Sequence, residues 1–234
     1  MEKFVNTCEI IWPYRFDLLV RIDFLEWFET VGRDYLPESN LSTITSDLLI
    51  SSPKFFIRAK QHPYFVQYAK LKRKYRLVNL TYQKAETVYA EGIASFIKLN
   101  EDVKANSFNL QRKIVLKKAF FNTKTYLKRW HIGDGCHRLA CLVWLNKEFL
   151  IPRRYLKYRY RLTHNPANSN LTAGYRILGI LKEEDVEHFD KIFGRGDMPE
   201  WNSTFQRVAE IRERFKLMDL EGMFNFRFKR LDFG

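Results

Sequence analysis

The tightest constraint on the fold is a two-glycine turn, Gly133-Asp134-Gly135, that separates a strand pattern from a helix pattern. Residues 125–132 before it have strand character, whereas Leu139 to Leu145 after it have helical spacing. Two glycines let the backbone bend sharply and approach a ligand closely. The helix start directs backbone N–H groups toward the turn, and His137 and Arg138 add positive charge. The sequence predicts either an anion-binding turn or a plain strand-to-helix connection capped by Asp134.

Strands and helices alternate around this turn. Periodicity predicts strands at 76–80, 113–116, 125–132 and 150–160, with a hairpin turn at 122–124, and helices at 16–28, 93–104, 139–145, 183–193 and 203–217. The order of strand, helix, hairpin, glycine turn, helix and strand indicates an α+β domain over residues 75–163. A helical N-terminal region, 1–74, precedes it, and a helical C-terminal extension, 164–234, follows it.

Charge restricts the class of partner. The chain of 234 residues has 40 Lys and Arg against 27 Asp and Glu, a net charge of +13, so its surface attracts phosphates, nucleic acid or anionic lipid. Its three cysteines, Cys8, Cys136 and Cys141, lack the spacing of a zinc site and fit a reducing compartment. We find neither a signal-peptide pattern nor an apolar run of about 18 residues. We therefore expect a compact cytoplasmic protein, for which peripheral membrane association stays open.

A family resemblance rests on the residues of the turn. Asp134-Gly135-Cys136-His137-Arg138, followed by a helix and by Ile151-Pro152 on a new strand, resembles the DGxHR signature of the ParB/sulfiredoxin superfamily. The helix over 96–104 falls where that fold has the helix before its hairpin. The resemblance covers about residues 75–161 and implies a small mixed sheet with helices. The superfamily includes nucleotide-binding DNA-partition proteins, sulfiredoxins and small-molecule kinases, so the reaction stays open.

The kinases of this superfamily provide the interpretation that we favour. In its free-serine kinases, the turn holds the nucleotide phosphates and a glutamate just after the first strand is the base. The resemblance implies ATP or ADP with Mg²⁺ as cofactors and a hydroxyl of a small molecule or glycan as acceptor. Asp134 would orient the magnesium ion or the acceptor, and Glu86 would be the base, with Glu91 in reserve. The phosphate-binding residues would be Gly133, Gly135, Cys136, His137 and Arg138.

Two alternatives come from the same superfamily. Cys136 stands where a sulfiredoxin has its catalytic cysteine, and a thiol at a helix start beside Arg138 is a competent nucleophile. A ParB-like nucleotide switch associated with DNA is the other alternative. It is supported by the basic residues at 70–74 and 153–161, which are interleaved with tyrosines, although an edge strand shows the same alternation. Nucleic acid is the less favoured partner.

The tail adds a second resemblance. Residues 217–222 and 228–234 are similar to the opening of a class I methyltransferase, in which a strand ends in Asp-x-Gly before a glycine-rich turn. Bacterial surface-polysaccharide clusters include ParB-like modules that precede such methyltransferases. The resemblance implies that this chain is the front module of such a protein and acts in polysaccharide biosynthesis.

Overall fold

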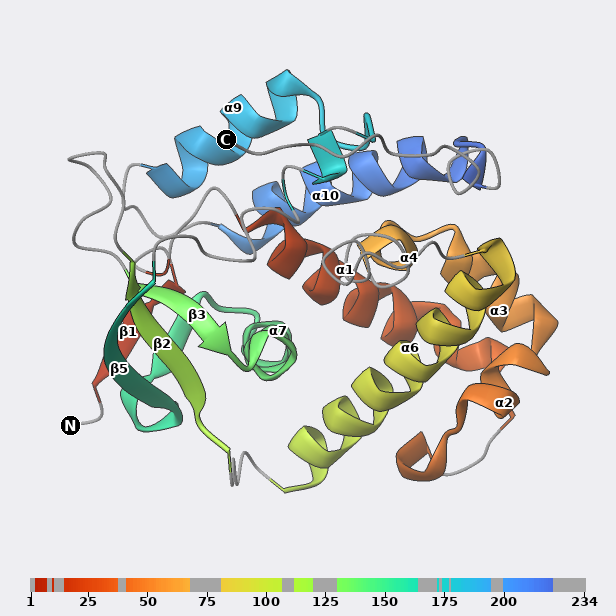
Figure 1. Cartoon of the computed structure of the whole chain (residues 1–234), viewed down its shortest axis with the longest axis horizontal. Coiled ribbons are helices and arrows are strands. Elements are labelled where there is room, and N and C mark those ends of the chain that lie inside the picture. Colours follow the sequence, from red (N-terminus) through yellow and green to blue (C-terminus); the bar gives the residue numbers. More distant parts are fainter. Residues whose placement is uncertain are drawn as a thin grey trace.

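The computed structural model shows a mixed α+β protein in which helices outnumber strands (Figure 1). It describes residues 3–7, 10, 15–37, 41–67, 81–106, 112–119, 130–163, 172, 174–176, 178–194 and 200–220. The strands lie at one end of the molecule, and the helices fill the rest. The α+β class is confirmed.

The helices form a layered body. The long α6 and the short α2 to α4 lie on one side of α1, and α9 and α10 lie on the other (Figure 1). Within the described ranges the α-helices are α1 (Phe16–Thr30), α2 (Ser46–Ile50), α3 (Pro53–Lys60), α4 (Tyr64–Val66), α6 (Tyr82–Ala105), α7 (Cys136–Asn146), α9 (Glu183–Gly194) and α10 (Trp201–Lys216). Short 3₁₀ turns, Gly32–Tyr35, Leu41–Thr43 and Arg153–Tyr155, connect some of them.

Helices α1 and α7 pack against each other at the centre of the molecule. Every residue from Phe16 to Leu25 is buried, as is every residue from Leu139 to Val143. A helix that is covered on all sides needs an almost continuous apolar sequence, which both segments have. The charged exceptions within α1 are Asp17, Arg21 and Asp23. Because these groups are buried, each must find a partner inside the protein.

Two small sheets cover one end of the helical body. Strands β1 (Phe4–Asn6) and β4 (Leu150–Pro152) pair antiparallel, and a separate three-stranded sheet has the order β3-β2-β5. In that sheet β2 (Ile114–Ala119) pairs antiparallel with β3 (Trp130–Asp134) and parallel with β5 (Leu156–Thr163). Four side chains of its inner face are buried, namely Ile114, Leu116, Ile132 and Leu156.

The elements differ from the sequence prediction in extent. Helix α6 begins at Tyr82, eleven residues before the predicted start, because the Thr81 side chain caps it by accepting from the Lys84 N–H (3.3 Å). The predicted strand 150–160 is two strands in different sheets. Pro152 ends β4, the 3₁₀ turn follows, and the Arg153 N–H donates to the Lys3 carbonyl. The prediction of one continuous strand was wrong for this reason.

The other predicted elements are confirmed where the structure describes them. The hairpin is present as β2 and β3, and the helices predicted at 16–28, 139–145, 183–193 and 203–217 are α1, α7, α9 and α10. The predicted strand at 76–80, the hairpin turn at 122–124, the basic run at 70–74 and the tail segment at 228–234 lie outside the described residues. Among the described helices, none combines the length and apolar composition that a membrane crossing needs.

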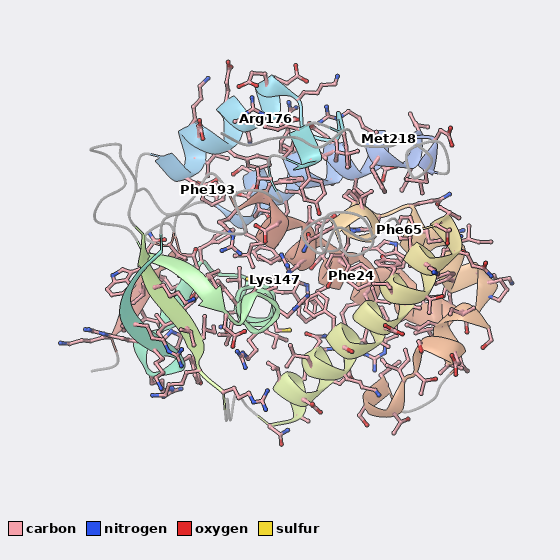
Figure 2. All side chains as sticks on the ribbon, viewed as in Figure 1. Phe24, Phe65, Lys147, Arg176, Phe193 and Met218 are labelled. Atoms are coloured by element: carbon pink, nitrogen blue, oxygen red, sulfur yellow. The ribbon has the colours of Figure 1, made fainter. Side chains whose placement is uncertain are left out.

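One hydrophobic core joins the three predicted regions. It contains residues from α1 in the N-terminal region, α7 in the central region and α10 in the C-terminal extension. Aromatic rings fill much of it; Phe24 and Phe65, labelled in Figure 2, belong to a cluster around Tyr64 and Tyr89. The helical additions therefore pack directly on the central region, and α1 supplies the helix against which α7 rests.

Candidate functional site

The turn between β3 and α7 is shaped by two glycines with different roles. Gly133 is the extra residue of a β-bulge, because Leu116 pairs with Ile132 and Val115 already pairs with Asp134. Gly135 has φ of +93°, a left-handed conformation that other residues rarely adopt. A Cβ on Gly135 would also lie 3.2 Å from the Ile114 backbone. The turn therefore requires glycine at 135, and α7 starts directly after it.

Arg138 and Asp134 face each other across this turn. The first hydrogen bond of α7 runs from the Leu139 N–H to the Gly135 carbonyl, so the amides of the preceding turn point toward the helix end. Arg138 Nη2 donates to an Asp134 carboxylate oxygen at 3.2 Å. The Asp134 side chain is 72% exposed and that of Arg138 only 14%. Arg138 is thus an embedded cation under an exposed carboxylate.

Residues of the helical body fix the position of the His137 ring. Its Nε2 lies 2.8 Å from the Tyr64 hydroxyl, and its ring packs on Phe96 with a centroid distance of 4.7 Å. Tyr64 is fully buried. A histidine clamped in this way has a fixed ring orientation, so Tyr64 on α4 and Phe96 on α6 position one of the predicted phosphate-binding residues.

Cys136 meets a buried arginine from the N-terminal region. Arg15 Nη2 lies 3.2 Å from the Cys136 sulfur, and Arg15 Nε donates to Asp17 at 2.8 Å. Arg21 donates to the second oxygen of the same carboxylate at 2.6 Å. Asp17 is completely buried, and both arginines are largely buried with it. The turn therefore sits beside a cluster of ionised groups inside the protein.

This cluster holds more positive than negative charge. Asp17 is the carboxylate that faces both Arg15 and Arg21. Burial alone would lower the pKa of Arg15, but the neighbouring Asp17 carboxylate and the hydrogen bonds to Asp17 and the Cys136 sulfur outweigh it and raise that pKa, so the guanidinium stays protonated. Arg15 Nη1 and Arg138 Nε are buried and have no hydrogen-bond partner among the described residues. Buried donors without a hydrogen-bond partner are uncommon, and such N–H groups are suited to donate hydrogen bonds to an anion.

A second buried network supports Tyr64. The Tyr64 N–H donates to His62 Nδ1 at 3.1 Å, which leaves His62 Nε2 to donate to Asp23 at 2.9 Å. Arg212 on α10 donates to the other oxygen of Asp23 at 2.9 Å. Burial lowers the pKa of His62 despite the neighbouring carboxylate, so the ring is held neutral. Through this network α10 fixes the segment that carries Tyr64.

The structure does not bring Glu86 to the turn. Its carboxylate forms an ion pair with Lys60 at the end of α3. It lies on α6 ten residues before Phe96, the residue that contacts His137. Ten residues of helix rise about 15 Å. Glu91, the reserve candidate, is exposed on the same helix. The other predicted site residues, Gly133 to Arg138, lie together because they are consecutive at the turn.

Sequence reasoning missed Arg15 and Tyr64. Neither is near the turn in the sequence, since 121 and 73 residues separate them from their partners. A signal was present for Arg15, because it flanks an apolar helix that also carries Asp17 and Arg21 at helical spacing. Charged groups in such a helix must be paired inside the protein or serve a site. For Tyr64 the sequence offers no comparable signal.

The comparisons with known proteins leave the chain without an assigned family. No family model, no curated protein and no solved structure matches it. The functional argument therefore depends on the geometry of the turn and on the residues around it.

Proposed function

We propose that the β3–α7 turn binds the phosphates of a nucleotide and that the protein transfers a phosphoryl group to a hydroxyl of a small molecule or glycan. The observation that carries the proposal is two buried donors without a partner among the described residues: Arg138 Nε in the first turn of α7, and Nη1 of the Arg15 guanidinium that contacts Cys136 through Nη2. Leaving such donors unpaired costs about 1–3 kcal/mol each, and phosphate oxygens would satisfy them. The fold that we propose for the central region is the ParB/sulfiredoxin type.

Each residue of the turn has a role in binding. Gly135, in its left-handed conformation, lets the helix start approach a phosphate closely. Arg138 neutralises phosphate charge from its embedded position, and His137, clamped by Tyr64, presents a ring of fixed orientation. Gly133 leaves space at the bulge, which the Lys117 side chain crosses. Cys136 contributes its backbone N–H as the first residue of the helix.

Asp134 is suited to hold a magnesium ion that arrives with the nucleotide. Mg²⁺ is usually bound by one or two carboxylates together with phosphates and water. Among the described residues no group of three or more His, Cys, Asp or Glu could hold a metal alone. One exposed carboxylate beside a phosphate site fits the shared mode of binding. The bound nucleotide would supply the phosphoryl group, and the metal would offset its charge.

Asp134 is also the carboxylate at the turn that could take the proton of the acceptor. Because Glu86 is paired with Lys60 about three helical turns from the His137 contact, we assign it no direct part in the reaction. The acceptor oxygen would gain the phosphoryl group as its bond to the leaving nucleotide breaks, which releases ADP from ATP or AMP from ADP, and Asp134 would take the hydroxyl proton. ATP or ADP is the proposed donor, and bacterial polysaccharide biosynthesis in the cytoplasm is the proposed setting.

Calorimetric titration with ATP, ADP and CTP in the presence of Mg²⁺ tests the binding step. We expect an adenine nucleotide to bind, and Arg138→Ala to weaken it at least tenfold. Arg33→Ala removes an exposed arginine of the helical body and is the matched control. Asp134→Ala should abolish transfer from radiolabelled ATP to a panel of hydroxyl compounds. Unchanged binding in Arg138→Ala, or no nucleotide binding at all, would refute the proposal.

A thiol reaction of the sulfiredoxin type is the second candidate. It is favoured by one contact, Arg15 Nη2 to the Cys136 sulfur at 3.2 Å, because a guanidinium stabilises a thiolate. Cys136→Ser separates the two candidates. Retained nucleotide binding and phosphoryl transfer in this variant would exclude the thiol mechanism, whereas loss of transfer with normal folding would favour it.

A further inference from the structure

The three-stranded sheet has two faces of opposite character. Its inner face is buried, with Ile114 and Leu116 of β2 beside Leu156 of β5. The residues between them point to the other side of the sheet. There Lys157 and Arg159 are exposed, and Lys117 is paired in register with Arg159. We call the surface formed by Lys117, Lys157 and Arg159 the outer face.

Gly133 leaves room for the Lys117 side chain to cross the outer face next to the turn. A Cβ on Gly133 would lie 2.7–2.8 Å from the Cγ, Cδ and Cε atoms of Lys117. The alkyl chain of Lys117 therefore lies directly across the glycine, and its ammonium group is carried over β3 toward the edge of the sheet. Lysine chains commonly cover a surface in this way while the charged end stays in water.

The cations of the outer face lack counter-charges. Lys117, Lys157 and Arg159 make no ion pair with any residue that the structure describes. The strand segments 112–119 and 150–163 together contain nine Lys and Arg and no Asp or Glu. Neighbouring strands lie about 4.8 Å apart, so these charges repel one another in the isolated protein. A polyanion laid across the face would remove that repulsion.

Two arginines next to the sheet stack on tyrosine rings. The Arg153 guanidinium lies 5.5 Å from the centre of the Tyr158 ring, and that of Arg154 lies 4.9 Å from the Tyr155 ring. Figure 2 shows nitrogen-tipped side chains projecting outward around these strands. Tyr158 follows Leu156 by two residues and so points to the inner side, which places the Arg153 stack beside the sheet and not on its outer face. The outer face itself carries three cations on two neighbouring strands.

We propose that this surface binds the phosphate backbone of a nucleic acid, independently of the reaction at the turn. An extended row of Lys and Arg without acidic neighbours is the electrostatic footprint of such binding. A membrane surface is less well matched, because membrane-binding faces combine cations with exposed apolar residues. The large exposed apolar side chains among the described residues lie outside this sheet, namely Phe4, Val31, Ile50, Ile57 and Leu217.

The salt dependence of binding to a 30-base-pair DNA duplex of mixed sequence tests this proposal. Each phosphate contact contributes about −0.9 to the slope of log K against log salt concentration. Contacts from Lys117, Lys157 and Arg159 alone predict a slope of about −2.7. The double variant Lys157→Gln, Arg159→Gln should bind at least tenfold more weakly and lose about 1.8 of that slope. A single strand and an RNA hairpin of equal length show which nucleic acid is preferred.

A matched control separates this surface from the overall charge. Lys54 on α3 and Lys191 on α9 are exposed, and the variant Lys54→Gln, Lys191→Gln changes the net charge equally. We expect it to bind duplex like the wild type. Equal weakening by both double variants would overturn the proposal, as would no binding at 50 mM salt. Preferential binding to phosphatidylserine vesicles would assign the surface to membranes instead. Both double variants should bind nucleotide like the wild type in calorimetric titrations. This readout distinguishes a failure of the nucleic-acid proposal from a failure of the function proposed for the turn.

Discussion

The helical body and the three-stranded sheet differ in whether their Lys and Arg side chains are paired with acidic residues. In the body, Arg15 and Arg21 share Asp17, Arg212 pairs with Asp23, and Arg214 pairs with Asp185 at 2.6 Å. On the outer face of the sheet, Lys117, Lys157 and Arg159 pair with no described acid.

This difference indicates what the charges do. Removing one partner of a buried ion pair strongly destabilises a protein, because the other charge is left buried without a partner. The pairs of the helical body therefore fix how its helices pack. Exposed cations add little to the stability of the fold, and their main effect is to attract negatively charged molecules to the protein surface. The turn between β3 and α7 lies on the border between these two regions.

The largest effect should come from breaking the pairing in the body. Asp17→Asn leaves Arg15 and Arg21 buried without their carboxylate, and we expect it to lower the free energy of unfolding by about 3–5 kcal/mol. Urea denaturation followed by circular dichroism measures this. Asp34→Asn, at an exposed position, should change it by less than about 0.5 kcal/mol. Similar values for the two variants would show that the buried pairs do not hold the body together.

Acidification should weaken the body through His62. Burial lowers the pKa of His62 below its ordinary value of about 6.5, so the unfolded chain binds a proton that the folded protein excludes. Stability therefore falls as pH decreases below about 6.5, by at most about 1.4 kcal/mol per pH unit. Urea denaturation between about pH 7.5 and 5.5 measures this slope, and His62→Gln should flatten it. An identical profile in the variant would contradict the assignment.

A smaller effect should appear where the body contacts the turn. Tyr64→Phe removes the hydroxyl that bonds to His137, and we expect a loss of about 0.5–1.5 kcal/mol in thermal or urea unfolding. Tyr35→Phe, which keeps the ring beneath Arg58, is the control and should leave stability unchanged. The chemical shifts of the His137 ring should move in Tyr64→Phe alone. If they do not, Tyr64 does not position His137.

The smallest effect should come from the sheet. Lys157→Gln with Arg159→Gln removes two exposed cations, and the free energy of unfolding should change by less than about 0.5 kcal/mol. The sign should be toward higher stability at low salt, because repulsion on the outer face is relieved. A loss above 1 kcal/mol in the same urea titration would mean that these charges have an internal partner, and the contrast between the two regions would fail.

The local elements of the fold were predictable and their extents were not. The apolar spacing of Phe16 to Phe28 predicted α1, and two glycines around Asp134 predicted the turn before α7. The division of 150–160 into two strands depends on the pairing of β4 with β1, almost 150 residues earlier in the chain. Periodicity within a segment contains no information about such a partner.

The site followed the same rule. The turn formed by residues 133–138 could be predicted because these residues are consecutive and carry their own conformational signal, and their role in binding stays a prediction. Arg15, Tyr64 and Phe96 reach the turn from three helical segments through tertiary contacts. The family pattern placed Glu86 by its distance from a strand, whereas in the structure its carboxylate pairs with Lys60 on α3.

The contact between Arg15 and Cys136 has a consequence for the order of folding. The two residues are 121 positions apart in the sequence. Contacts between such distant residues form late in folding, because closing the long loop between them costs conformational entropy before the contact can stabilise the protein. During synthesis Arg15 leaves the ribosome long before Cys136. Its guanidinium therefore stays exposed to water until α7 packs against α1. The proposed anion site would thus form only when these distant parts of the chain have come together, and ligand binding would then report that folding is complete.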